Sequence, residues 1–68
     1  MEKRTLFARL QMHRSQYQQL HMRTAEMDMR ILEQLAKGRS ATQIALETPC
    51  PEATVYRAIG RAKGFLKE

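Results

Sequence analysis

Apolar side chains recur three and four positions apart along most of this 68-residue chain. Nowhere do they alternate with polar side chains over a strand-length run, and β-branched residues are few. A spacing of three and four keeps side chains on one face of a helix, whereas a strand needs a spacing of two. The pattern therefore predicts an all-α fold. The length allows at most one domain, which buries only about 60% of the surface of its unfolded chain.

The single cysteine, Cys50, removes the usual way of stabilising so short a domain, because it has no partner for an internal disulfide. It also favours a reducing, cytoplasmic location. No metal site or other cofactor is expected, since His13 and His21 are eight residues apart with no acidic residue at ligand spacing. Packing of helices and pairing of two chains remain as sources of stability.

Residues 1–23 carry five basic side chains and one acidic side chain, and the apolar spacing predicts a helix over residues 4–22. Its stripe is too short for an autonomous coiled coil, but it suffices for a dimer contact or for packing on the rest of the chain. Of these two alternatives we favour the dimer. The candidate dimer residues are Leu6, Leu10, His13, Tyr17 and Leu20.

A second helix is predicted from Ala25 to Lys37, because Thr24 suits an N-cap and two acidic residues follow in the first turn. Gly38 suits the left-handed residue that ends many helices. The side chains expected to face inward are Met27, Ile31, Leu32, Leu35 and Ala36.

Two further helices follow. Ser40 and Gln43 have the spacing of a capping box, which opens a short helix that buries Ile44 and Ala45. The segment 48–51, Thr-Pro-Cys-Pro, ends that helix, and Pro51 suits the first position of the last helix, over residues 51–66. Its expected buried face is Val55, Ile59, Ala62 and Leu66.

Two short helices joined by a tight break after a longer packing helix form a helix-turn-helix pattern, here over residues 24–68. The residues that characterise this pattern are Ile31-Leu32-x-x-Leu35-Ala36-x-Gly38-x-Ser40-x-x-x-Ile44-Ala45, then Thr54-Val55-x-x-x-Ile59 and Leu66. It resembles the LuxR/GerE helix-turn-helix family, and residues 54–63 are also similar to region 4 of bacterial sigma factors.

These resemblances imply a bacterial or phage regulator of transcription that binds double-stranded DNA. The chain departs from the LuxR/GerE pattern at Thr48 and Pro51, where the family has a large aliphatic residue and a serine cap. The family also has a further C-terminal helix, commonly used for dimer contacts, and the sequence up to Glu68 does not include it. The resemblance therefore carries over DNA-contacting positions but not the geometry of a dimer.

The second helix of such a pair enters the major groove while the first braces it. Arg57 is the leading base-contact candidate, since a guanidinium can pair with both O6 and N7 of guanine. The other base-contact candidates are Tyr56, Ala53 and Glu52. Tyr56 has the alternative of packing on a neighbouring helix. The phosphate-contact candidates are Ser40, Thr42, Gln43, Thr54, Arg61 and Lys63, with capping alone as the alternative for Ser40.

The leading hypothesis is a small cytoplasmic, sequence-specific transcription regulator that acts as a homodimer and associates with the nucleoid when bound. The net charge of +5 fits a polyanionic partner. The alternative is an interaction module that binds RNA polymerase, a sigma factor or another regulator. An enzyme is not expected, because no nucleophile–base set or glycine-rich phosphate loop is present, and no apolar run approaches the ~20 residues of a membrane span.

Overall fold

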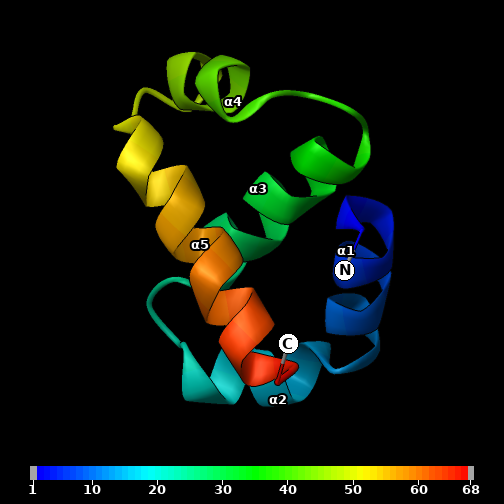
Figure 1. Cartoon of the computed structure of the whole chain (residues 1–68). Helices are drawn as coiled ribbons and strands as arrows, with labels where there is room; N and C mark the ends of the chain where they lie inside the picture. Colours follow the sequence, from blue (N-terminus) through cyan, green and yellow to red (C-terminus); the bar gives the residue numbers. More distant parts are fainter. Residues whose placement is uncertain (1, 68) are drawn as a thin grey trace.

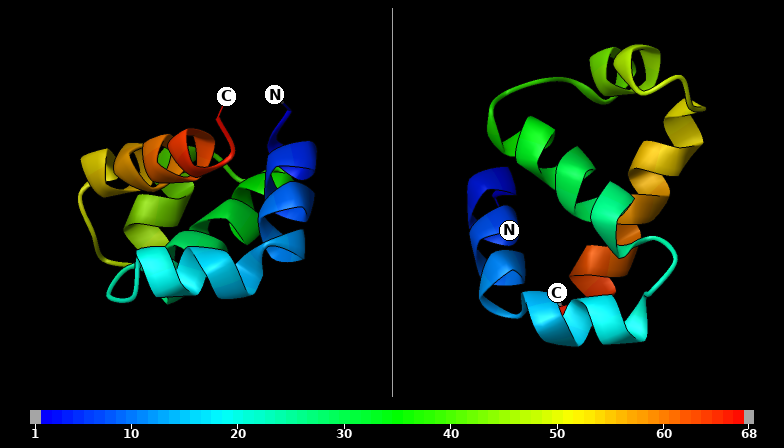
Figure 2. Two further views of the ribbon diagram at one scale, coloured as in Figure 1. Left: turned by 90° about the horizontal axis from the view of Figure 1, so that it is seen from below. Right: turned by 180° about the vertical axis from the view of Figure 1, so that it is seen from behind.

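The computed structural model describes residues 2–67 and shows five helices in that range, with no strand (Figure 1). The helices are α1 (Lys3–Met12), α2 (Arg14–Leu20), α3 (Ala25–Ala36), α4 (Ala41–Glu47) and α5 (Glu52–Phe65). The all-α prediction is confirmed. α3 lies between α1 and α5 and packs against both, while α4 packs against α5 and α2 closes the opposite end (Figures 1 and 2).

The predicted single helix over residues 4–22 is wrong, because the chain bends at His13, whose φ of −115° and ψ of 29° are not helical. The His13 N–H donates to the Leu10 carbonyl oxygen at 3.1 Å, a tightened last turn, and the His13 carbonyl then accepts from Tyr17 N–H at 2.9 Å to start α2. The bend turns α2 away from α1 (Figure 2). The chain therefore packs the stripe of α1 against α3 and still brings Tyr17 to α5.

α3 begins at Ala25, as predicted, but its buried face differs from the predicted one. Met27 is 39% exposed and Ala36 is only half-buried, whereas Asp28 and Met29 are buried. The reason is that α3 has a helix on each side, α1 and α5, so that its buried arc is wider than one stripe. The arc consequently includes a charged residue, Asp28.

The turn between α3 and α4 matches its sequence signals. Gly38 has a φ of +96°, in the left-handed region that glycine adopts without strain. Ser40 N–H donates to Gln43 Oε1 at 3.0 Å and Gln43 N–H donates to Ser40 Oγ at 3.1 Å, which completes the predicted capping box. Ile44 and Ala45 are buried, as expected.

α5 begins at Glu52, with Pro51 as its N-cap rather than its first residue. Val55, Ala62 and Leu66 are buried as predicted, Ile59 is half-buried, and Ala58 joins the buried face. A single hydrophobic cluster takes side chains from all five helices. Residues 1–23 and 24–67 therefore share one core. No helix within residues 2–67 is both long enough and apolar enough to cross a membrane.

The proposed dimer stripe needs a correction. Leu6, Leu10 and Tyr17 are buried in the chain's own core, where Leu6 and Leu10 belong to the helix that packs on α3. Of the two alternatives, packing on the rest of the chain accounts for these three side chains. Leu20, by contrast, is 66% exposed, and His13 is exposed.

Candidate nucleic-acid interface

The outer surface of α5 presents all four residues predicted to contact bases, Glu52, Ala53, Tyr56 and Arg57, as exposed side chains. Tyr56 is 58% exposed, and its hydroxyl donates to Glu52 Oε1 at 3.4 Å, one turn earlier on the same helix. Tyr56 therefore does not pack on a neighbouring helix. Arg57 forms no ion pair or hydrogen bond of its side chain with residues 2–67, so its guanidinium is available to a ligand.

On the same surface, Gly60 and Gly64 have no side chains, so the backbone of α5 is exposed at these two positions. A Cβ added to either glycine would meet no atom within 4 Å. Packing inside the chain therefore does not require glycine at these positions, although each glycine costs a helix about 1 kcal/mol relative to alanine. The space above both residues is open to an external surface that approaches the helix backbone closely.

The inner face of α5 is fixed by full burial, since Val55, Ala58 and Ala62 have no exposed surface. α4 braces the start of α5 (Figure 1). In the connection between them, Cys50 N–H donates to the Ala45 carbonyl oxygen at 3.1 Å, and the half-buried Cys50 side chain packs on the core. This packing leaves α5 one free face and holds it in a single orientation.

The predicted phosphate contacts fall into three groups. Thr42 and Lys63 are exposed, and Thr54 is half-buried. Ser40 and Gln43 bond to each other's backbone in the capping box, so capping accounts for both of these side chains.

Arg61 is the third case, and there the prediction of a phosphate contact is corrected. Its Nε lies 3.0 Å from Asp28 Oδ2 and its Nη2 lies 2.7 Å from Asp28 Oδ1, a bidentate pair between α5 and α3. Only 29% of the Arg61 side chain is exposed, and Asp28 is fully buried. The Arg61 guanidinium is therefore held by a carboxylate inside the protein. Leaving the buried Asp28 carboxylate unpaired would strongly lower the free energy of unfolding.

Tyr17 completes a buried network that links three helices. Its hydroxyl donates to Asp28 Oδ2 at 2.5 Å, and its ring packs edge-on against Phe65, with the ring centroids 5.1 Å apart. Asp28 therefore receives one hydrogen bond from α2 and two from α5. The network connects the N-terminal part of the chain directly to the helix that carries the candidate interface.

The pKa values of the network follow from this arrangement. Burial raises the pKa of Asp28, but the hydrogen bonds from Arg61 and Tyr17 outweigh burial and hold it below its usual value. Burial, together with the hydrogen bond to the Asp28 carboxylate, raises the pKa of Tyr17 far above its usual range. The hydrogen bond to Asp28 raises the pKa of Arg61. At neutral pH the network is an ion pair with a neutral tyrosine.

This network was not predicted from the sequence, because Asp28 fits the acidic residue expected in the first turn of a helix. A signal was nevertheless present. Asp28 precedes Ile31, Leu32 and Leu35 by three, four and seven positions, so it lies on the apolar stripe of α3. A carboxylate on such a stripe needs a buried partner, although the partner's position, 33 residues later, could not be identified from spacing.

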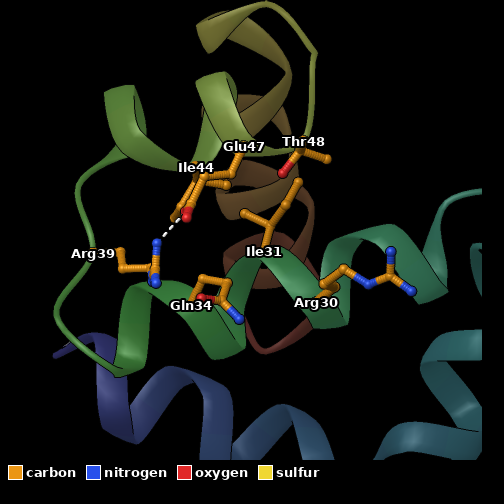
Figure 3. A pocket seen from close by; sticks show the side chains of 7 residues that line it. All are labelled: Arg30, Ile31, Gln34, Arg39, Ile44, Glu47 and Thr48. Atoms are coloured by element: carbon orange, nitrogen blue, oxygen red, sulfur yellow. Dashed lines mark hydrogen bonds and ion pairs between the residues drawn. The ribbon is translucent and has the colours of Figure 1, made fainter.

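A groove between α3 and α4 lies away from the outer face of α5 (Figure 3). Arg39 at its edge forms an ion pair with Glu47, and the Arg30 guanidinium points away from that pair. Its remaining lining residues are Ile31, Gln34, Ile44 and Thr48. An exposed ion pair of this kind contributes about 0–1 kcal/mol to stability.

Within the described part of the chain, no three histidine, cysteine or acidic side chains lie close enough to hold a metal ion. Comparisons with protein-family models, with curated proteins and with solved structures found no match to this chain.

Proposed function

We propose that this protein is a DNA-binding regulator of transcription that inserts α5 into the major groove of double-stranded DNA. The observation that carries the proposal is the exposed outer face of α5. Its one arginine on that face, Arg57, has no partner among residues 2–67, although the helix itself is locked into the core by Val55, Ala58 and Ala62. A rigid helix with a free polar face is the part that groove recognition requires.

The dimensions of the face support the proposal. A helix with its side chains is about 10–12 Å across, and the major groove is about 12 Å wide. Ala53, Gly60 and Gly64 keep the helix backbone uncovered, so it can approach the DNA closely. Glu52, Tyr56 and Arg57 are long side chains that project from this surface, and Arg57 can pair with O6 and N7 of a guanine.

Charge and resemblance support the proposal further. The chain carries a net charge of +5, and Lys63 lies exposed on α5. Its sequence resembles the LuxR/GerE helix-turn-helix from Ile31 to Leu66. We include a homodimer in the proposal, with its contact on exposed residues such as Leu20, because Leu6, Leu10 and Tyr17 are occupied inside the chain.

The test is the Arg57→Ala variant, compared with Lys37→Ala, which removes an exposed cation beyond the end of α3. Selection from random DNA sites should yield a preferred sequence for the unmodified protein and for Lys37→Ala. Arg57→Ala should lose discrimination by about 1–3 kcal/mol at one base pair, measured by fluorescence anisotropy. Failure of the unmodified protein to bind DNA at 50 mM salt would overturn the proposal.

A second candidate function is an interaction module for RNA polymerase, a sigma factor or another regulator. It is favoured by Leu46, which is 76% exposed on the outer side of α4. Co-purification with a polymerase subunit that is lost in Leu46→Ser, together with no DNA binding at low salt, would favour this candidate. Retention of DNA binding without any such partner would exclude it.

A further inference from the structure

α5 carries one acidic side chain, Glu52, in its first turn. Glu52 is exposed, and it forms no ion pair with any of residues 2–67. Because DNA is a polyanion, a carboxylate on a helix in the groove weakens binding unless a base donates a hydrogen bond to it. The net positive charge of the chain and the guanine contact of Arg57 leave this side chain without a role.

Tyr56, one turn later on α5, restricts the position of the Glu52 carboxylate. The Tyr56 hydroxyl donates to Glu52 Oε1 at 3.4 Å. The second oxygen, Oε2, has no hydrogen-bond donor among residues 2–67, and an ionised carboxylate accepts through both oxygens. The outer face of α5 therefore presents an available acceptor at Glu52 in addition to the available donors of Arg57.

Glu52 and Arg57 lie on opposite flanks of this face. Five positions correspond to about 140° around a helix and about 7.5 Å along it. Ala53 and Gly60 lie between the two flanks by the helical period, and neither has a long side chain. Two base-pair steps span about 6.8 Å, since each step adds about 3.4 Å. With α5 along the groove, the two charged side chains therefore reach different base pairs, about two steps apart.

We propose that Glu52 is a specificity-determining residue that accepts a hydrogen bond from the exocyclic amine of a cytosine in the major groove. The inference rests on the proposed function and adds a second base contact to it. Residues at the start of a recognition helix commonly contact base edges. Cytosine presents its N4 amine in the major groove, whereas thymine and guanine present the acceptor oxygens O4 and O6.

A carboxylate discriminates between these bases by repulsion as well as by attraction. The N4 amine of cytosine attracts Glu52, whereas O4 of thymine and O6 of guanine repel it. Adenine presents an amine at N6, but its neighbouring N7 is an acceptor and repels the second carboxylate oxygen. Glu52 therefore lowers the affinity for incorrect sequences, including the phosphate-only contacts of non-specific binding.

The test compares Glu52→Ala and Glu52→Gln by selection from random DNA sites and by fluorescence anisotropy at 50 mM salt. Glu52→Ala should lose about tenfold of the discrimination in favour of cytosine at one base pair. Its affinity for DNA of unrelated sequence should rise, since no carboxylate repels the phosphates. Glu52→Gln should change the preferred base from cytosine to adenine, because an amide pairs with N6 and N7 of adenine. The guanine selected by Arg57 should be retained in both variants.

Tyr56→Phe tests the positioning of the carboxylate, because it removes the hydroxyl and keeps the ring. The preference for cytosine should weaken about threefold, as expected for the loss of one hydrogen bond. An undiminished preference for cytosine in this variant would overturn the role given to the Tyr56 hydroxyl.

Glu26→Gln is the matched control. Glu26 is also an exposed acidic residue in the first turn of a helix, but it lines a hollow between α1 and α3. The variant loses the same charge near a helix N-terminus, and its base preference should not change. Unchanged base preference in both Glu52 variants, with discrimination lost in Arg57→Ala, would overturn the inference and leave the proposed function standing. Absence of DNA binding by the unmodified chain would overturn both.

Discussion

Arg61 on α5 donates hydrogen bonds to both carboxylate oxygens of Asp28 on α3, from Nε at 3.0 Å and from Nη2 at 2.7 Å. The carboxylate that accepts these bonds is not exposed to solvent, because Asp28 is fully buried. A planar guanidinium fixes two bonds at once, so the pair restrains both the distance between the helices and the rotation of α5. The buried Arg61–Asp28 pair therefore helps to set the orientation of the outer face of α5.

Removal of Arg61 from this buried pair should lower the free energy of unfolding far more than removal of an exposed arginine. We expect Arg61→Ala to lower the free energy of unfolding by about 3–5 kcal/mol, because it leaves the Asp28 carboxylate buried and uncompensated. A chain of this length has about 3–10 kcal/mol in total. Arg57→Ala, on the exposed face of the same helix, should change it by less than about 0.5 kcal/mol. Urea unfolding followed by circular dichroism measures both, and equal effects would contradict the buried role of Arg61.

Stability should depend on pH at both extremes. The pKa of Asp28 is below its usual value in the folded protein, so its contribution is present above about pH 4 and is lost as pH falls through the folded pKa. The pKa of Tyr17 is raised, so its contribution is present below about pH 10 and is lost as pH rises further.

Unfolding midpoints measured from pH 2 to pH 11 check this expectation. Tyr17→Phe should lose part of the alkaline decline, because the buried hydroxyl that must ionise is gone. Tyr56→Phe is the matched control, since Tyr56 is the exposed one of the two tyrosines. Identical alkaline profiles for the two variants would show that Tyr17 is not responsible.

The burial of Leu10 predicts that the N-terminal helix stabilises the single chain. Leu10→Ala should cost about 2–5 kcal/mol, since it opens a cavity between α1 and α3. Leu20→Ala should cost less than about 0.5 kcal/mol, because Leu20 is exposed. The unmodified protein should stay folded on dilution to about 2 μM, whereas a fold that depends on pairing would be lost there, and a higher unfolding midpoint at about 100 μM would report the proposed homodimer.

The two exposed glycines of α5 offer a variant that separates stability from binding. Gly60→Ala with Gly64→Ala should raise the unfolding free energy by about 1–2 kcal/mol, because alanine favours the helix and the added Cβ atoms meet nothing within 4 Å. DNA affinity should fall in the same variant if the DNA approaches the helix backbone there. An increase in stability without any loss of affinity would show that the glycines are merely tolerated.

Features that depend on neighbouring residues could be predicted from the sequence. The capping box of Ser40 and Gln43 and the left-handed Gly38 are set by residues within a few positions of each other. The buried face of α5 follows from the helical period, so Val55 and Ala62 were predicted correctly. The exposed base-contact candidates follow from the same period, on the opposite side.

Features that depend on which helices meet could not be predicted in this way. The bend at His13 has no proline or glycine to mark it, and it follows from the packing of α1 on α3 and of Tyr17 on α5. The burial of Leu10 within the chain and the pairing of Arg61 with Asp28 join residues more than ten positions apart. Spacing identifies the face of a helix but not the neighbour that covers it.

The alternation along α5 of buried Val55, Ala58 and Ala62 with exposed Ala53, Tyr56 and Arg57 has a consequence for how this protein can change. Substitutions on the outer positions touch no core side chain, so the stability of the fold places little constraint on them. The fold is thus a stable scaffold on which the exposed residues of α5 can be substituted together. Variants with new outer residues should keep the same unfolding free energy while differing in the surface they recognise.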